Sequence, residues 1–144
     1  MKHLFFVLLL CFVCNGALAQ QSERFGHFEL HWSVVNTTFL EPAVAAQYGI
    51  KRGRKTAILN LAVREHLTSD DGTEARPMQI EGRTWDLIQN QFLSFKEVRE
   101  GPAIYYIAEF SFINEEWRFF EMDFRPEGSD TTYTYKFKHQ LYIN

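Results

Sequence analysis

The sequence predicts an all-β protein, a two-sheet antiparallel sandwich of immunoglobulin-like shape with about seven strands and one short helix. Runs in which apolar and polar residues alternate recur along the chain, as in strands that bury one face. Turn-forming residues separate these runs at short intervals. Aromatic residues make up 16% of the chain and suit the space between two packed sheets. A small barrel with a helix is the alternative architecture.

The N-terminal segment, residues 1–19, predicts a cleaved secretory signal peptide. Lys2 and His3 provide a basic start, an apolar run extends from Leu4 to Cys14, and Ala17-Leu18-Ala19 forms an A-x-A cleavage site. The apolar run is shorter than the roughly 20 residues that a transmembrane helix needs. Both cysteines lie in this segment, so no disulfide is expected after cleavage.

The next part of the chain predicts a strand followed by a helix. Residues 20–24 are polar and are expected to be frayed. Apolar and polar residues alternate from Phe28 to Val34, which predicts a strand. Pro42 suits a first helical turn and Gly49 suits a left-handed C-terminus, so a helix is predicted near 42–48. We expect this helix to cross between two strands.

The middle of the chain continues the strand pattern. A strand is expected from Thr56 to Leu67. Residues 66–76 contain Asp-Asp-Gly and predict a long exposed hairpin loop. A weaker strand is expected within 77–91, where Gly82 suggests a β-bulge. Residues 92–99 predict another strand.

The C-terminal part contains the runs most typical of strands, residues 103–114, 117–125 and 131–143. The first two runs carry apolar residues on both faces, as in Ile104-Tyr105-Tyr106-Ile107. A strand that is apolar on both sides is either covered on both faces or presents one face to a partner. Both interpretations of these two runs stay open at the level of sequence.

The length of residues 20–144 corresponds to one domain, which at this size buries roughly two thirds of its unfolded surface. The formal net charge of −3 becomes −4 once Lys2 is removed, whereas nucleic-acid binding needs a strongly basic face. No second long apolar run follows the signal segment, so we expect no transmembrane segment. Secretion without disulfides favours the bacterial periplasm.

Residues capable of catalysis or metal binding form no recognisable pattern. No serine lies in a G-x-S-x-G elbow. On a strand, His27 and His31 would lie about 13 Å apart at 3.3 Å per residue, too far to share one ion. His66 and His139 each stand alone in the sequence. Asp70-Asp71 and Glu115-Glu116 are expected to be solvated turn residues. The sequence therefore predicts no catalytic residue, no metal site and no cofactor.

One candidate binding surface combines three polar segments of the chain. These are Asn36-Thr37-Thr38, the basic loop with Lys51, Arg52, Arg54 and Lys55, and the turn of Arg99 and Glu100 near Tyr105. The four cations suit a solvated loop, or an anionic partner such as a lipid headgroup, a cell-wall polymer or an acidic protein face. An ion pair between Arg99 and Glu100 that fixes the turn is the structural alternative for these two residues.

The segment 99–110, REGPAIYYIAEF, resembles a group of short secreted gammaproteobacterial proteins known as domain of unknown function 4426. Residues 36–40 followed by Pro42 and 48–50 also match this family, as does Asn114-Glu115-Glu116. As a set these motifs are fairly specific, and they span nearly the whole of the mature chain. The resemblance implies a periplasmic single-domain β-sandwich and brings no assigned reaction, cofactor or partner.

We therefore expect a non-catalytic periplasmic protein that binds another envelope component or acts as an accessory subunit. A carrier of a small apolar ligand between the sheets is the alternative, and it needs a cavity lined by Trp32, Tyr105 or Tyr106. An unrecognised hydrolase is a third hypothesis, and it needs clustered titratable groups with perturbed pKa values in a cleft.

Overall fold

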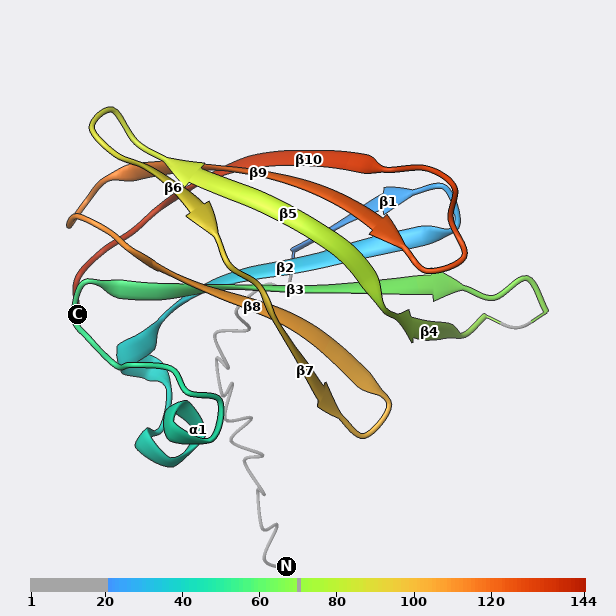
Figure 1. Ribbon diagram of the computed structural model, residues 1–144, viewed down its shortest axis with the longest axis horizontal. Coiled ribbons are helices and arrows are strands. Elements are labelled where there is room, and N and C mark those ends of the chain that lie inside the picture. The colour runs from blue at the N-terminus through green and yellow to red at the C-terminus, as the bar shows by residue number, and fades with distance from the viewer. Residues whose placement is uncertain (1–20, 70) are drawn as a thin grey trace, which may run out of the picture.

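The computed structural model describes residues 21–69 and 71–144, so the predicted signal peptide and Asp70 lie outside the described residues. Two antiparallel sheets pack face to face (Figure 1), which confirms the predicted sandwich. The elements are β1 (Gln21–Phe25), β2 (Phe28–Asn36), η1 (Thr37–Phe39), α1 (Pro42–Gln47), β3 (Thr56–His66), β4 (Thr73–Arg76), β5 (Met78–Trp85), β6 (Asn90–Leu93), β7 (Lys96–Glu100), β8 (Ala103–Ser111), β9 (Trp117–Pro126) and β10 (Tyr133–Gln140). Sheet A has the order β1-β2-β3-β8-β7, with β4 also paired to β3, and sheet B has the order β10-β9-β5-β6.

The core fills the space between the two sheets. Alternate residues of each strand face inward, as in β9, where Phe120, Met122 and Phe124 are fully buried. Trp32 of β2 stacks on Phe137 of β10 with ring centroids 3.7 Å apart, and Phe137 stacks on Phe120 at 4.7 Å. Such interdigitation is how two packed sheets close their common interior. Trp32 is thus packed against side chains rather than lining an open cavity.

Helix α1 confirms the predicted helix in position but not in role. Gly49 follows it at φ 67°, the left-handed conformation expected at this C-terminus. The flanking strands β2 and β3 are antiparallel neighbours, so the helix lies in a long connection between paired strands and is not a crossover. It covers part of the outer face of sheet A, where Ala45 packs with Ile58 and Ile107. Within the described residues, no helix is long and apolar enough to cross a membrane.

The described residues form ten strands rather than about seven. β1 replaces the expected frayed terminus, because residues 21–25 pair with β2 although their side chains remain largely exposed. β4 pairs with the end of β3 inside the expected hairpin loop. The run 92–99 divides between β6 of sheet B and β7 of sheet A. Short or exposed strands carry little period-two hydrophobic signal, which is why the sequence did not predict them.

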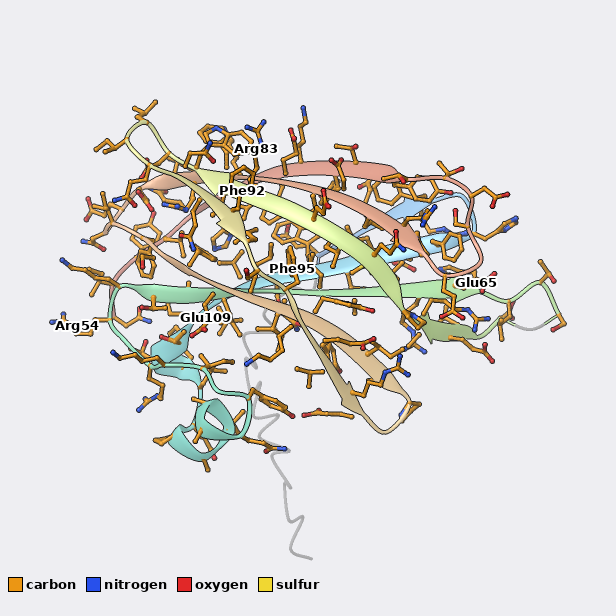
Figure 2. The ribbon with its side chains drawn as sticks, viewed as in Figure 1. Arg54, Glu65, Arg83, Phe92, Phe95 and Glu109 are labelled. Carbon is orange, nitrogen blue, oxygen red and sulfur yellow. The ribbon has the colours of Figure 1, made fainter. Side chains whose placement is uncertain are left out.

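Gly82 of β5 is not a β-bulge, which corrects the expectation from sequence. The pairing of β5 with β9 runs through Gly82 without an extra residue. A Cβ atom there would lie 3.1 Å from the ring of Phe95 and 3.2 Å from the carbonyl oxygen of Glu121. Phe95 belongs to the link between β6 and β7, in the middle of the molecule (Figure 2). Glycine is needed at position 82 because this ring packs across β5.

The outer faces of β8 and β9 differ in how they are covered. Ile107 of β8 packs on the cluster beneath α1, and Tyr105 is half-buried on the same face. On β9, Trp117 and Phe119 remain 49% and 37% exposed, whereas Phe120 faces the core. Within the described ranges, the cluster beneath α1 therefore covers Ile107 on the outer face of β8, and the aromatic outer face of β9 stays open.

Candidate functional site

The basic loop, residues 51–55, is fixed to the end of β2 by one buried hydroxyl group. Thr37 is fully buried, and its Oγ1 accepts the backbone N–H of Gly53 at 3.0 Å. The same oxygen lies 3.0 Å from the carbonyl oxygens of Gly53 and Thr56. Arg52 Nη2 donates to the carbonyl oxygen of Thr38 at 3.0 Å. The structure thus brings the segments 36–38 and 51–55 together, and it gives Thr37 a structural position beneath the surface.

The four cations of this loop are exposed and have no acidic partner among the described residues. No salt bridge within residues 21–69 and 71–144 includes Lys51, Arg52, Arg54 or Lys55. Arg54 extends outward at the edge of the molecule in Figure 2. Glu109 lies near the loop, but its Oε1 accepts the backbone N–H of Lys51 at 3.1 Å. The positive charge of the loop is therefore available to solvent or to a partner.

An exposed aromatic ring adjoins the basic loop. Phe39 ends the short helix η1 and is 69% exposed. The bond between Arg52 and the carbonyl group of Thr38 fixes η1 beside the loop. Asn36 donates from Nδ2 to the carbonyl oxygen of Tyr142 at 2.6 Å and so ties the end of β2 to the C-terminal segment. We call Phe39 and the four cations of the loop the basic surface.

The other predicted site residues, Arg99, Glu100 and Tyr105, lie towards the opposite end of β8. Ser111, at the last residue of β8, pairs with Thr56 next to the basic loop. At about 3.3 Å per residue, the strand from 103 to 111 spans roughly 26 Å. The three polar segments named from the sequence therefore do not form one continuous surface.

The ion pair of Arg99 is also different from the one expected. Arg99 Nη2 lies 3.2 Å from Glu97 Oε1, and Glu100 is not its partner. Residues 97 and 99 are two apart on β7 and share a face of the strand, whereas residues 99 and 100 point to opposite faces. The pair is exposed, so its contribution to stability is small.

A histidine–carboxylate cluster on the outer face of sheet A was not predicted. His66 Nε2 lies 2.7 Å from Glu29 Oε2, and His31 Nε2 lies 3.8 Å from Glu29 Oε1. The hydroxyl of Ser22 donates to the same Oε1 at 2.7 Å. Hydrogen bonds from Ser22 and then from His66 lower the pKa of Glu29. His66 therefore does not stand alone, and its partner comes from a neighbouring strand that sequence spacing cannot reveal.

Arg118 of β9 is a cation buried inside the sandwich, with 1% of its side chain exposed. Its Nε donates to Thr84 Oγ1 at 2.9 Å, and its Nη1 donates to Glu116 Oε1 at 3.0 Å. Nη1 also lies 3.5 Å from Asp86 Oδ2. The guanidinium stands 5.5 Å from the ring centroid of Phe110. One buried cation thus contacts two carboxyl groups.

These two carboxyl groups have pKa values that are pushed apart. A hydrogen bond from Glu116 lowers the pKa of Asp86 to about 2, aided by the backbone N–H groups of Gln89 and Ile88. Burial raises the pKa of Glu116, and its hydrogen bond to Asp86 adds to this effect. Glu116 is therefore not the solvated turn residue expected from the sequence, because its side chain is only 10% exposed.

A groove of about 560 Å³ opens at the surface next to this buried network. We call it the apolar groove, and its lining consists of five apolar and three charged residues: Leu87, Ile88, Ile113, Trp117, Phe119, Asp86, Glu116 and Lys138. Leu87 is 100% exposed and Ile88 is 81% exposed. The Nζ of Lys138 lies 5.0 Å from the ring centroid of Trp117. The sequence indicated a two-sided apolar strand here but gave no sign of the groove.

Comparison with known families identifies the chain. A family model described as Domain of unknown function (DUF4426) matches residues 22–144. The chain belongs to the DUF4426 family. This confirms the resemblance drawn from the motifs in the sequence. A solved DUF4426 family protein from Pseudomonas aeruginosa PAO1 is similar, with a TM-score of 0.73 and 26% identity over 87% of this chain and 96% of that chain. No curated protein sequence matches the chain.

The DUF4426 fold is also similar to that of FetP from uropathogenic Escherichia coli strain F11. A copper-bound FetP variant aligns with a TM-score of 0.62 and 13% identity, over 88% of this chain and 97% of that one. FetP as isolated, after recombinant expression in the E. coli periplasm, aligns with a TM-score of 0.62 and 11% identity, over 87% and 95%. At these identities the likeness concerns the fold alone.

Proposed function

We propose that this protein is a non-catalytic component of the bacterial envelope that binds the anionic lipid surface of a membrane through its basic surface. The supporting observation is the set of four exposed cations without acidic partners among the described residues, in a chain with a formal net charge of −3. The predicted signal peptide supports a periplasmic location.

The charge of the basic surface is large enough for such binding. A basic residue near an anionic bilayer contributes about 1 kcal/mol, so four contribute about 4 kcal/mol, or roughly a thousandfold in partitioning. The buried hydroxyl of Thr37 holds the loop in place, which lowers the entropy lost on binding. Phe39 adds an exposed apolar side chain that suits the headgroup region. A ring beside the cations favours a lipid surface over a cell-wall polymer or an acidic protein face.

The perturbed carboxyl pair, Asp86 and Glu116, is the arrangement in favour of the hydrolase alternative. Three features support a structural role instead. Asp86 Oδ2 is fully buried, both side chains are at most 10% exposed, and Arg118 contacts both groups. A glycosidase pair flanks an open site that admits substrate, whereas Arg118 Nη1 lies 3.0 Å from Glu116 Oε1 and 3.5 Å from Asp86 Oδ2 and holds both carboxyl groups in the interior.

Copper is bound by the FetP variant, but the described residues of this chain give no support for a copper site. The nearest grouping is Glu29 with His31 and His66, and its two imidazoles contact different oxygens of the carboxylate. In the part of the chain that the structure describes, no group of three His, Cys, Asp or Glu side chains is arranged to hold a metal ion. The proposal therefore includes no metal.

Co-sedimentation with lipid vesicles tests the proposal. The chain without its predicted signal peptide is expected to bind phosphatidylglycerol vesicles and not phosphatidylcholine vesicles, and binding should weaken as salt rises. Changing the four loop cations to Gln should abolish binding. A matched control makes the same change in net charge elsewhere, at Arg24, Arg99, Arg125 and Lys136, and should retain most of the binding.

Equal binding by the loop variant and its control would refute the proposal. Binding to isolated cell-wall polymer or to an acidic protein, without binding to phosphatidylglycerol vesicles, would assign the basic surface to a different partner. Phe39→Ser separates the apolar contribution, and it should weaken vesicle binding without changing its salt dependence.

A further inference from the structure

We infer that the apolar groove, together with the β5–β6 hairpin tip beside it, is the contact surface between two copies of this chain. The surface belongs to sheet B and does not use the basic surface, so this inference is independent of membrane binding. Large exposed apolar side chains gather on this part of the described sandwich.

The hairpin tip displays its apolar residues on a fixed backbone. Leu87 and Ile88 occupy the turn between β5 and β6 and are 100% and 81% exposed. Asp86 Oδ1 accepts the backbone N–H groups of Ile88 at 2.7 Å and Gln89 at 2.5 Å, which shapes the turn. A preformed projection loses little conformational entropy when it is covered. Monomeric soluble proteins rarely expose a contiguous apolar patch of this kind without a partner for it.

The apolar area matches what a dimer interface needs. Six large apolar residues on or beside the outer face of sheet B are 37–100% exposed: Leu87, Ile88, Phe92, Ile113, Trp117 and Phe119. Figure 2 shows Phe92 with Arg83 on this side of the molecule, near the hairpin tip. At roughly 150–250 Å² for an aromatic side chain, and somewhat less for Leu or Ile, their exposed area is about 700 Å². A stable interface of standard size buries about 800 Å² on each partner.

The shape and charge of this patch are also complementary to those of a second copy of the same patch. In a two-fold symmetric interface each copy presents the same surface, so the surface must contain both a projection and a hollow, and both signs of charge. Here the projecting tip of Leu87 and Ile88 borders a groove of about 560 Å³. Lys138 and the acidic residue Glu116 both line that groove. A two-fold axis through the patch places the tip of each copy in the groove of the other.

Covering the groove does not bury an uncompensated charge. Arg118 lies behind it and contacts both Asp86 and Glu116, so the acidic side of the groove already has an internal counter-ion. Lys138 stands over the ring of Trp117 and is exposed at the rim. The desolvation cost that opposes burial of charged groups is therefore small at this surface.

Sedimentation equilibrium of the chain without its signal peptide tests this inference. From about 1 µM to about 1 mM, the protein is expected to change from monomer to dimer. Leu87→Ser with Ile88→Ser should raise the dimer dissociation constant at least about 30-fold, as the loss of central anchor residues does. Phe39→Ser is the matched control, because Phe39 is a large apolar residue that is 69% exposed away from the groove. It should leave the dissociation constant unchanged.

A monomer at every concentration would overturn the inference, and so would equal weakening by the tip variant and the Phe39 control. Circular dichroism must remain that of the parent protein in both variants, which is expected because the substituted side chains are exposed. As a second measurement, quenching of tryptophan fluorescence by acrylamide should decrease with protein concentration in the parent chain, because Trp117 is 49% exposed in a single copy. Unchanged quenching in a dimer would place the interface on another surface.

Discussion

Replacing Arg118 by Met is expected to lower the free energy of unfolding by about 3–5 kcal/mol. Met keeps most of the side-chain length and removes the charge. The change deletes the hydrogen bonds to Thr84 and Glu116, at 2.9 and 3.0 Å, and it removes the counter-ion of Asp86 at 3.5 Å. The largest part of the cost comes from Asp86, because its buried carboxylate loses its only cation among the described residues.

A second background separates this charge effect from lost packing. With Asp86→Asn already present, the guanidinium has one acidic partner, Glu116, instead of two, so Arg118→Met should cost less, about 1–2 kcal/mol. Both comparisons can be measured by urea unfolding followed through tryptophan fluorescence. In the parent background the melting temperature should fall by roughly 10–20 °C. An equal loss of stability in both backgrounds would show that the buried ion pair is not the source of the effect.

Substitutions at three further positions provide additional tests. The pKa of Glu116 is raised, so its contribution to stability is complete below its ordinary value of 4.5 and declines as pH rises through the folded pKa. Glu116→Gln should flatten that decline in unfolding experiments from acid to neutral pH, and an unchanged profile would contradict the assignment. Thr37→Val should cost about 1–3 kcal/mol, because it leaves the N–H of Gly53 without its acceptor, whereas Thr37→Ser, which keeps the hydroxyl, should melt close to the parent protein. Gly82→Ala should cost about 1–3 kcal/mol through overlap with the ring of Phe95; a melting temperature equal to that of the parent would disprove this close contact.

The sandwich was predictable from sequence because its central strands bury one face each. Leu30 and Trp32 on β2, and Leu59 and Leu61 on β3, are buried at alternate positions, as their spacing indicated. The helix was predictable because its end signals, proline and glycine, act locally. The passage of the chain from β6 to β7 was not predictable, because the residues on both sides of Phe95 continue an ordinary strand pattern while the chain changes sheet.

The candidate sites were also predictable only where the residues involved are close together in the sequence. The basic loop is visible as four cations in five residues, and the structure leaves them exposed. The burial of Thr37 could not be predicted from the sequence, because a threonine in a turn-forming segment is usually exposed to solvent. Arg118 offered one usable sign, since it shares the inward register of Phe120 on β9. Its partner Asp86 comes from a distant part of the chain, and only the pairing of β5 with β9 brings the two together.

Within residues 21–69 and 71–144, the chain passes between the two sheets three times, from β4 to β5, from β6 to β7 and from β8 to β9. None of these passages connects β1 or β2 to β10. There the sheets are held by side-chain contacts such as those of Phe25 with Tyr133, whose ring centroids lie 5.3 Å apart. The covalent links between the two sheets therefore lie away from the edge formed by β1 and β10. Transient opening should begin at that edge. Backbone amides of β1 and β10 should exchange with solvent deuterium earlier than those of the strands joined by the links.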